Sequence, residues 1–178
     1  MTLINKQRAK ALALALLLLV LLALFLIQVP TLLVSEQQGG AILAIPMLFN
    51  DTFTYEYIHS VLKTPVQENF ILAPGHDLIL TSTTYQSLGV GTPFLPGEGK
   101  LENRNGLFVL KGQNRHFPQV NLVFLPLTKQ ALIYREKRYN FEDYTEPGSL
   151  IKLESTSCTL VEIFWFSTHR KEGNLERS

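Results

Sequence analysis

The stretch "YIHSVLKTPVQENF", from Tyr57 to Phe70, places a histidine, a lysine and a glutamate among aromatic and aliphatic residues. We interpret it as the centre of a β-hairpin, "YEYIHSVL" followed by "PVQENFIL", with Lys63-Thr64 as a two-residue turn. In that register His59 faces Glu68 across the two strands, and Tyr55 and Tyr57 lie on the same face of the sheet. A carboxylate on an apolar face is costly alone, and an opposing imidazole would give it a charge-assisted hydrogen bond.

The strand that follows brings more polar side chains to the same face. If "PGHD" is a tight turn, "DLILTSTTYQS" pairs with the second strand of the hairpin. The expected pairs are Phe70 with Thr81, Glu68 with Thr83, and Val66 with Tyr85. These polar groups would form a satisfied network that holds the register, a small-molecule site, or the acid–base pair of a hydrolase. Ser60 faces the opposite side of the strand from His59, which argues against a serine–histidine nucleophile pair.

A long loop rich in glycine, "SLGVGTPFLPGEG", begins just beyond Tyr85 and would close over the same end of the sheet. It lacks the lysine–serine pair and the following helix of a phosphate-binding loop. We therefore interpret it as a strand crossover that completes a ligand site. The residues that we predict to bind a ligand are His59, Ser60, Lys63, Glu68, Thr83, Tyr85, Ser87, Gly89 and Gly91.

The N-terminal region predicts a membrane anchor. The segment from Ala11 to Val34 carries no charge, and its purely apolar part, Ala11–Ile27, is just long enough to cross a bilayer as a helix. Lys6, Arg8 and Lys10 precede it, and such cations stay on the cytoplasmic side. A cleaved signal peptide is the alternative, but no clear Ala-x-Ala site follows. We expect a single-pass protein of the cell (inner) membrane, with the lipid bilayer as a partner and the C-terminal domain on the periplasmic or extracellular side.

The rest of the chain predicts one all-β domain. Short runs rich in β-branched and aromatic residues alternate with turn residues, and no stretch keeps a helical period. We expect an antiparallel β-sandwich, or a partly open barrel, of roughly eight to nine strands. The expected divisions are a basic cytoplasmic start (1–10), a transmembrane helix (11–34), a linker (35–40), the β domain (41–168) and a polar tail (169–178).

Three local features of the domain lead to further predictions. The segment "TLVEIFWF", residues 159–166, is apolar on both faces, which is typical of a central strand or of a strand that faces a bilayer or a partner. Cys158, the only cysteine, would be buried beside it as a small hydrophobic group. Pro126 cannot donate a ladder hydrogen bond, so the strand in "VNLVFLPL" ends there or lies at an edge.

Composition and spacing exclude several classes of function. The 178-residue chain has a formal net charge of +1, without the concentrated basic face that nucleic-acid binding requires. Its histidines, acidic residues and cysteine show no metal-ligand spacing such as HxH, HExxH or CxxC. We therefore expect no metal, no cofactor and no nucleic-acid partner.

The segments "HSVLKTPVQE" and "YQSLGVGTP" resemble a bacterial family, the domain of unknown function numbered 1850. Its members carry a His-Ser-Val-x-[Lys/Arg]-Thr hairpin motif with a downstream Glu, followed by Ser-x-Gly-x-Gly, and one N-terminal apolar segment. The matching positions are His59, Ser60, Val61, Lys63, Thr64, Pro65, Glu68, Ser87, Gly89 and Gly91. The chain departs from the family at Leu62, where an acidic residue is common, and at Val90, where a smaller residue is usual.

The resemblance also implies a biological context. Genes of this family often lie beside TRAP transporters of the TAXI type, which import small organic anions. The function that we expect is a membrane-anchored extracytoplasmic binding or accessory module for such a transporter, with a small organic anion as its ligand. An exported hydrolase that uses His59 and Glu68 as base and acid, and a purely structural membrane-associated scaffold, are the alternatives.

Overall fold

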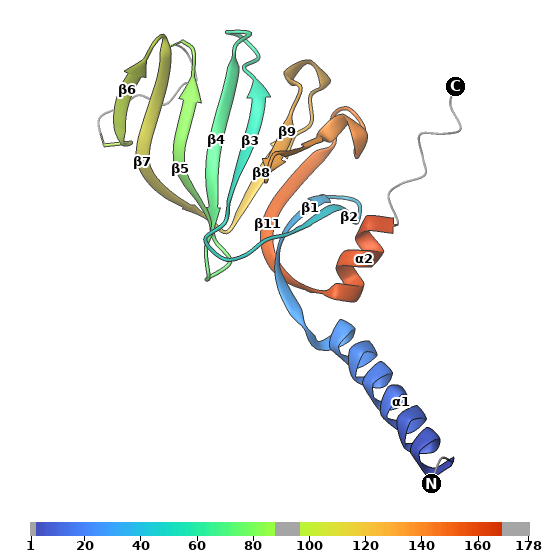
Figure 1. Ribbon diagram of the computed structural model, residues 1–178. Coiled ribbons are helices and arrows are strands. Elements are labelled where there is room, and N and C mark those ends of the chain that lie inside the picture. Colours follow the sequence, from blue (N-terminus) through green and yellow to red (C-terminus); the bar gives the residue numbers. More distant parts are fainter. Residues whose placement is uncertain (1–2, 88–96, 169–178) are drawn as a thin grey trace.

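The computed structural model describes residues 3–87 and 97–168 of the chain. One N-terminal helix, α1 (Leu3–Leu26), leads into two antiparallel sheets (Figure 1). The strands are β1 (Gln28–Glu36), β2 (Ala41–Pro46), β3 (Thr52–Ile58), β4 (Pro65–Leu72), β5 (Leu78–Tyr85), β6 (Lys100–Arg104), β7 (Leu107–Phe117), β8 (Gln119–Val123), β9 (Ala131–Tyr134), β10 (Lys137–Asn140) and β11 (Leu150–Thr159). Two short 3₁₀ helices, η1 (Pro126–Thr128) and η2 (Phe141–Asp143), and a second α-helix, α2 (Leu160–Thr168), complete the described elements.

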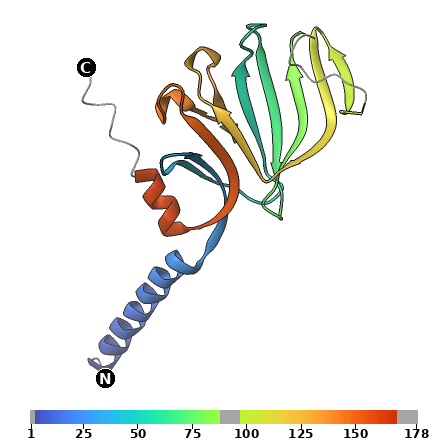
Figure 2. The same cartoon turned by 180° about the vertical axis from the view of Figure 1, so that it is seen from behind.

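The smaller sheet has the strand order β2-β1-β11-β8, and the larger has the order β10-β9-β3-β4-β5-β7-β6. The predicted all-β, antiparallel, sandwich-like fold is therefore confirmed. The described residues form eleven strands rather than the expected eight to nine, because β1 lies partly in the segment expected to be helical and the short strands β6 and β10 are rich in polar residues. Strands β5, β7 and β6 extend the larger sheet past the edge of the smaller one (Figures 1 and 2).

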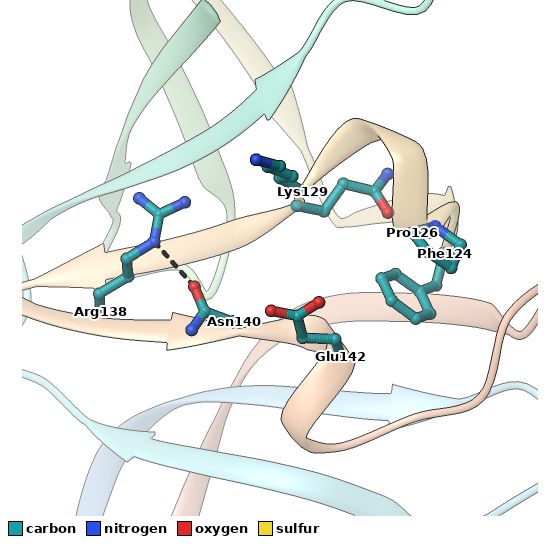
Figure 3. Close-up of a pocket in the computed structure, with 7 residues that line it drawn as sticks. Phe124, Pro126, Lys129, Arg138, Asn140 and Glu142 are labelled. Atoms are coloured by element: carbon teal, nitrogen blue, oxygen red, sulfur yellow. Dashed lines mark hydrogen bonds between the residues drawn. The ribbon is translucent and has the colours of Figure 1, made fainter.

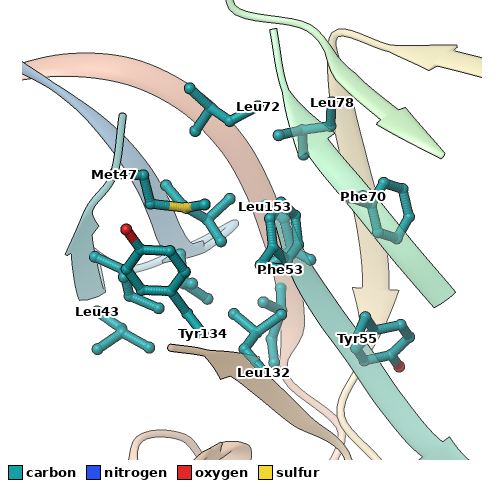
Figure 4. Close-up of a cluster of buried hydrophobic side chains, with 14 of the residues drawn as sticks. Leu43, Met47, Phe53, Tyr55, Phe70, Leu72, Leu78, Leu132, Tyr134 and Leu153 are labelled. Carbon is teal, nitrogen blue, oxygen red and sulfur yellow. The ribbon is translucent and has the colours of Figure 1, made fainter. Parts of the chain in front are cut away.

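The main core lies between the two sheets. Strand β11 buries every second residue over most of its length, and Leu153 has no exposed surface. From the larger sheet, Phe53 and Phe70 stack with their ring centroids 5.3 Å apart and pack into the same cluster (Figure 4). Alternating side chains of two facing sheets thus bury one continuous apolar layer, whose removal from water stabilises the fold.

The N-terminal helix ends earlier than predicted. Its segment Lys6–Leu26 has a mean hydropathy of 2.8, is not buried against the domain, and is long and apolar enough to cross a membrane. The sequence analysis extended this helix to Val34, but Gln28–Glu36 forms strand β1. Leu32 and Val34 are fully buried in the core, so the weakly polar end of the apolar segment belongs to the β domain.

The prediction of a strand over "TLVEIFWF" is wrong beyond Thr159, the last residue of β11, because residues 160–166 lie in helix α2. A capping box starts the helix: the Glu162 carboxylate accepts hydrogen bonds from the Thr159 amide and hydroxyl, and the Thr159 hydroxyl accepts one from the Glu162 amide. The run is apolar almost throughout, so it shows neither the alternation of a half-buried strand nor the 3.6-residue period of an amphipathic helix. Its residue pattern therefore did not distinguish the two. Cys158, the preceding residue, is buried in β11 as predicted.

The predicted hairpin is present, but its register differs by four residues. Glu68 of β4 lies opposite Tyr55 of β3, where the prediction placed His59. The connection is the whole segment 59–64, closed by backbone hydrogen bonds from His59 N–H to the Thr64 carbonyl and from Lys63 N–H to the His59 carbonyl. Because the shift is an even number of residues, Glu68 keeps its face of the sheet while its partner changes.

The second predicted pairing is largely correct. Val66 lies opposite Tyr85, and Glu68 lies opposite Thr83, as expected. A bulge after Asn69 then places Phe70 opposite Leu80 instead of Thr81. The prediction for Pro126 is also confirmed, since β8 ends at Val123 on the edge of the smaller sheet and Pro126 begins η1.

Candidate binding groove

A groove of about 300 Å³ opens where the edge strand β8 and η1 approach the inner face of β3 and β4. We call it the Glu68 groove. Its lining residues are Tyr55, Tyr57, Ile58, His59, Ser60, Glu68, Leu122, Leu125, Thr128 and Gln130. The strands of the larger sheet supply the acidic and phenolic groups, and the β8–η1 segment supplies most of the apolar wall.

The acidic group of the groove is the largely buried carboxyl of Glu68. Its only hydrogen bond among the described residues comes from the Tyr57 hydroxyl, 3.4 Å from Oε1. No ion pair with the Glu68 carboxylate is present among the described residues. Burial raises the pKa of the Glu68 carboxyl, while the Tyr57 hydroxyl and the positive charge of Arg115 act in the opposite direction. A largely buried acid with so few partners can still hydrogen-bond a ligand, as an acceptor when it is ionised and as an O–H donor when it is neutral.

Gln130 joins this face to the smaller sheet. Its Nε2 donates to the Tyr55 hydroxyl at 2.8 Å and to the Val123 carbonyl at 3.1 Å, and its Oε1 accepts from the Leu125 amide at 3.0 Å. The Tyr55 hydroxyl oxygen is thereby an acceptor, and its own hydrogen remains to be donated. Burial raises the pKa of Tyr55 well above its usual value, so the phenol stays protonated.

His59 lies at the rim, where β3 ends. Its Nδ1 accepts hydrogen bonds from the backbone amides of Val61 at 3.2 Å and Leu62 at 3.1 Å. An Nδ1 that accepts carries no proton, so the neutral ring has its hydrogen on Nε2. The imidazole therefore orders the β3–β4 turn and presents an N–H donor rather than a free base.

His59 and Glu68 line the same groove, but no hydrogen bond or ion pair joins them among the described residues. Their predicted cross-strand pairing is wrong because His59 lies beyond the end of β3. A hydrolase that uses His59 as its base would need a nitrogen free to accept a proton, and the backbone amides occupy Nδ1. This arrangement favours binding over acid–base chemistry.

The other predicted site residues lie at several different places in the fold. Ser60 lines the groove, whereas the exposed Lys63 belongs to the turn, where it adopts a left-handed backbone with φ of 55°. Thr83 is buried on the inner face and donates to Oε1 of Gln113 at 2.7 Å. Tyr85 is buried against Phe108, with 6.0 Å between ring centroids, and is not part of the groove lining. Ser87 is half-buried just after β5, and Gly89 and Gly91 lie outside the described residues.

The sequence analysis did not select Tyr55, Tyr57 or Gln130 as site residues. The two tyrosines were placed on the correct face, where their alternation with polar neighbours was a usable signal. Gln130 had no such signal, because it reaches Tyr55 only through the pairing of β9 with β3, two strands that lie far apart in the sequence.

Gln113 extends the polar part of the same inner face along β7. The residue is 8% exposed, and its Nε2 has no hydrogen-bond partner among the described residues. A buried amide donor without a partner costs free energy, so the face is not a fully satisfied structural network.

A second cavity, of about 290 Å³, lies beside Lys129, Arg138 and Glu142 (Figure 3). Arg138 donates to Asn140 at 2.8 Å within this cavity, and it forms a 2.6 Å ion pair with Glu56. Its charge is therefore already matched, and Lys129 and Glu142 are solvent-exposed. These are the properties of a polar surface rather than of a built ligand site.

His76, in the β4–β5 turn, contacts two serines of β11. Its Nδ1 lies 3.0 Å from the Ser155 hydroxyl, and its Nε2 lies 3.4 Å from the Ser157 hydroxyl. Among the described residues, neither ring nitrogen contacts an acid that could orient the ring for catalysis. The contacts instead join this turn to the smaller sheet. In the described ranges, no three His, Cys, Asp or Glu side chains group as metal ligands.

Comparison with protein families gives one match. A family model described as a domain of unknown function (DUF1850) matches residues 53–141, half of the chain. The matched range begins in β3, ends in η2 and contains every residue that lines the Glu68 groove. No curated protein and no solved structure matches the chain.

Proposed function

The chain belongs to the DUF1850 family, whose description assigns no activity, and we propose that it is a membrane-anchored module that binds a small organic anion outside the cytoplasm. We further propose that it does so as an accessory of a TAXI-type TRAP transporter. The single observation that carries the binding proposal is the buried Glu68 carboxyl, which has one long phenolic contact and a raised pKa.

Three hydrogen-bond donors line this groove when Glu68 is neutral. The Glu68 carboxyl then carries an O–H, the Tyr55 hydroxyl has its hydrogen left to donate, and His59 carries a proton on Nε2. A carboxylate ligand offers acceptors for all three, and the neutral acid does not repel it. The side chains of Leu122 and Leu125 provide an apolar surface for the carbon skeleton of such a ligand.

The membrane location rests on the N-terminal sequence. Helix α1 is long and apolar enough to span, and Lys6, Arg8 and Lys10 lie at its N-terminal end. By the distribution of positive charge, this end remains in the cytoplasm and the β domain lies outside. The β3–β4 turn lies at the end of the domain remote from α1 (Figure 1). This arrangement supports a groove whose rim is accessible away from the membrane.

Binding of small carboxylates tests the proposal directly. The full chain in detergent would be titrated calorimetrically with acetate, succinate and citrate at mildly acidic and mildly alkaline pH. Affinity should fall as pH rises, because ionised Glu68 repels the ligand. Glu68→Gln keeps a neutral donor and should bind at both pH values. Glu68→Ala should bind at least roughly tenfold more weakly, as expected for a lost hydrogen bond to a charged group.

Glu146→Gln is the matched control, since Glu146 is exposed and lies outside the groove. It should leave both the affinity and its pH dependence unchanged. The binding proposal fails if the wild-type chain binds none of these carboxylates, or if Glu68→Gln retains the wild-type pH dependence.

Co-purification tests the transporter role separately. The full chain would be purified from its own membranes in mild detergent, with α1 fused to an unrelated domain as the control. TAXI-type transporter subunits should accompany the full chain and be absent from the control. Their absence from both samples would contradict the accessory role without affecting the binding result.

A further inference from the structure

The pairing of β1 with β11 places the end of α1 next to the start of α2. Gln28, the first residue of β1, pairs with Thr159, the last residue of β11. Helix α1 ends at Leu26, two residues before this pair, and α2 begins at Leu160, immediately after it. The register therefore fixes the start of α2 beside the end of the apolar helix.

Helix α2 does not continue α1 but is inclined to it and rises beside the domain (Figures 1 and 2). It contacts β2 on the domain and also contacts α1. If α1 crosses the bilayer, the start of α2 lies near the membrane surface. Trp165 is within roughly 9 Å of the Gln28–Thr159 pair along the helix, because each residue adds ~1.5 Å.

The composition of α2 suits lipid better than water. Six of its nine residues are apolar, in the run "LVEIFWFST". Phe164 and Trp165 keep 68% and 51% of their surface exposed. The one charged residue, Glu162, is exposed at the first turn, where its carboxylate accepts the hydrogen bonds of the capping box with Thr159.

We infer that α2 is an interfacial membrane helix, which inserts Phe164 and Trp165 into the headgroup region of the same bilayer that α1 crosses. The inference rests on the proposed membrane anchoring and is independent of the Glu68 groove. A lipid surface fits better than a protein partner, because an α1 that crosses the bilayer places the membrane surface next to the start of α2. Tryptophan and phenylalanine are also the side chains that interfacial helices place at this depth. The contact would fix the tilt of the β domain on the membrane.

Trp165 is the only tryptophan of the chain, so its fluorescence reports on α2 alone. The full chain would be reconstituted into phosphatidylcholine–phosphatidylglycerol vesicles that contain lipids spin-labelled near the headgroup or at the end of the acyl chain. The shallow label should remove about half of the Trp165 emission, the deep label less, and aqueous iodide little, as expected for a side chain ~5–10 Å deep. Phe164→Glu should increase quenching by iodide without releasing the chain from the vesicles.

The control is the double variant Trp165→Phe with Leu127→Trp. Leu127 is 88% exposed on η1, which follows the end of β8. Val123 of β8 pairs with Leu150, the opposite end of β11 from α2, roughly 30 Å away at ~3.3 Å per residue. The tryptophan introduced at position 127 should be quenched by iodide and by neither of the spin-labelled lipids.

Vesicle flotation separates the two ways in which the result can fail. A chain that does not float with the vesicles overturns the anchor and this inference together. A chain that floats, but whose Trp165 responds only to iodide, overturns the inference about α2 alone. Trp165 that neither lipid nor iodide reaches would be covered by protein, which also overturns it.

Discussion

The Tyr57 hydroxyl lies 3.4 Å from Oε1 of Glu68, longer than the ~2.5–3.0 Å of a good O–H···O hydrogen bond. The largely buried carboxyl thus lacks a strong internal hydrogen-bond donor. Such an arrangement disfavours the charged form of the acid and costs stability when the acid ionises. The stability of this domain and its proposed ligand binding therefore both depend on the protonation state of Glu68.

The first prediction concerns the pH dependence of stability. Because burial raises the pKa of Glu68 in the folded state, its favourable contribution is complete below the ordinary pKa of 4.5. The contribution is lost as pH rises through the raised value. Urea denaturation across this range should show a fall in the free energy of unfolding that is absent in Glu68→Gln. At neutral pH, Glu68→Gln should be at least as stable as the wild-type chain.

Asp51 provides a control of opposite sign for this measurement. Hydrogen bonds from the Tyr134 hydroxyl and the Leu48 amide lower the pKa of Asp51. Its stabilisation is present above the ordinary pKa and is lost as pH falls through the lowered value. Asp51→Asn should therefore be less stable than wild type at neutral pH. If Glu68→Gln keeps the wild-type dependence of unfolding free energy on pH, the assignment of that dependence to Glu68 is contradicted.

The second prediction concerns the role of His59 in the β3–β4 turn. His59→Ala removes the acceptor for the Val61 and Leu62 amides and should lower the free energy of unfolding by about 0.5–1.5 kcal/mol. His59→Asn places a short side-chain acceptor near the same amides and should restore part of that stability. Chemical denaturation measures both variants. Equal losses in the two variants would mean that the imidazole acts through something other than its accepted hydrogen bonds.

The third prediction tests the core with one substitution at two positions. Leu153 is fully buried between the sheets, whereas Leu127 is 88% exposed on η1. Leu153→Ala should cost about 2–5 kcal/mol, because it removes buried surface and leaves a cavity. Leu127→Ala should change stability by less than ~0.5 kcal/mol. Thermal and urea unfolding would compare them, and similar losses in both would be inconsistent with this core.

The fourth prediction concerns the start of α2. Glu162→Ala removes the carboxylate that accepts from the Thr159 amide and hydroxyl, at a cost of about 1 kcal/mol to the helix. Glu162→Gln retains an acceptor oxygen and should lose less. Hydrogen exchange of the α2 amides measures the effect, with exchange in β11 as the internal control. Faster exchange throughout both elements would indicate loss of the domain rather than of the cap.

The hairpin illustrates how far sequence reasoning can reach. The alternation of "YEYIHSVL" and "PVQENFIL" correctly placed Tyr55, Tyr57 and Glu68 on one face, because side-chain direction along a strand is a local property. The partner of Glu68 was wrong because it depends on the conformation of the turn. That turn is ordered by the imidazole and by backbone hydrogen bonds, which no feature of the residue pattern indicated.

Helix α2 shows a different limit. "TLVEIFWF" is compatible with a buried strand and with a short apolar helix, because both consist of a continuous apolar run. The Thr-x-x-Glu capping box was present in the sequence, but it becomes decisive only where β11 ends its pairing with β1 at Thr159. The end of the ladder, rather than the composition, selects the helix.

The sequence by itself determined the apolar N-terminal helix, the all-β class and the inward-facing residues of the strands, since each follows from short-range periodicity. Tertiary structure alone decided that Tyr55 rather than His59 opposes Glu68, that Gln130, just before β9, reaches Tyr55 of β3, and that α2 begins beside the end of α1. These relationships join residues distant in the chain, and the free energy that selects them comes from packing two complete sheets together.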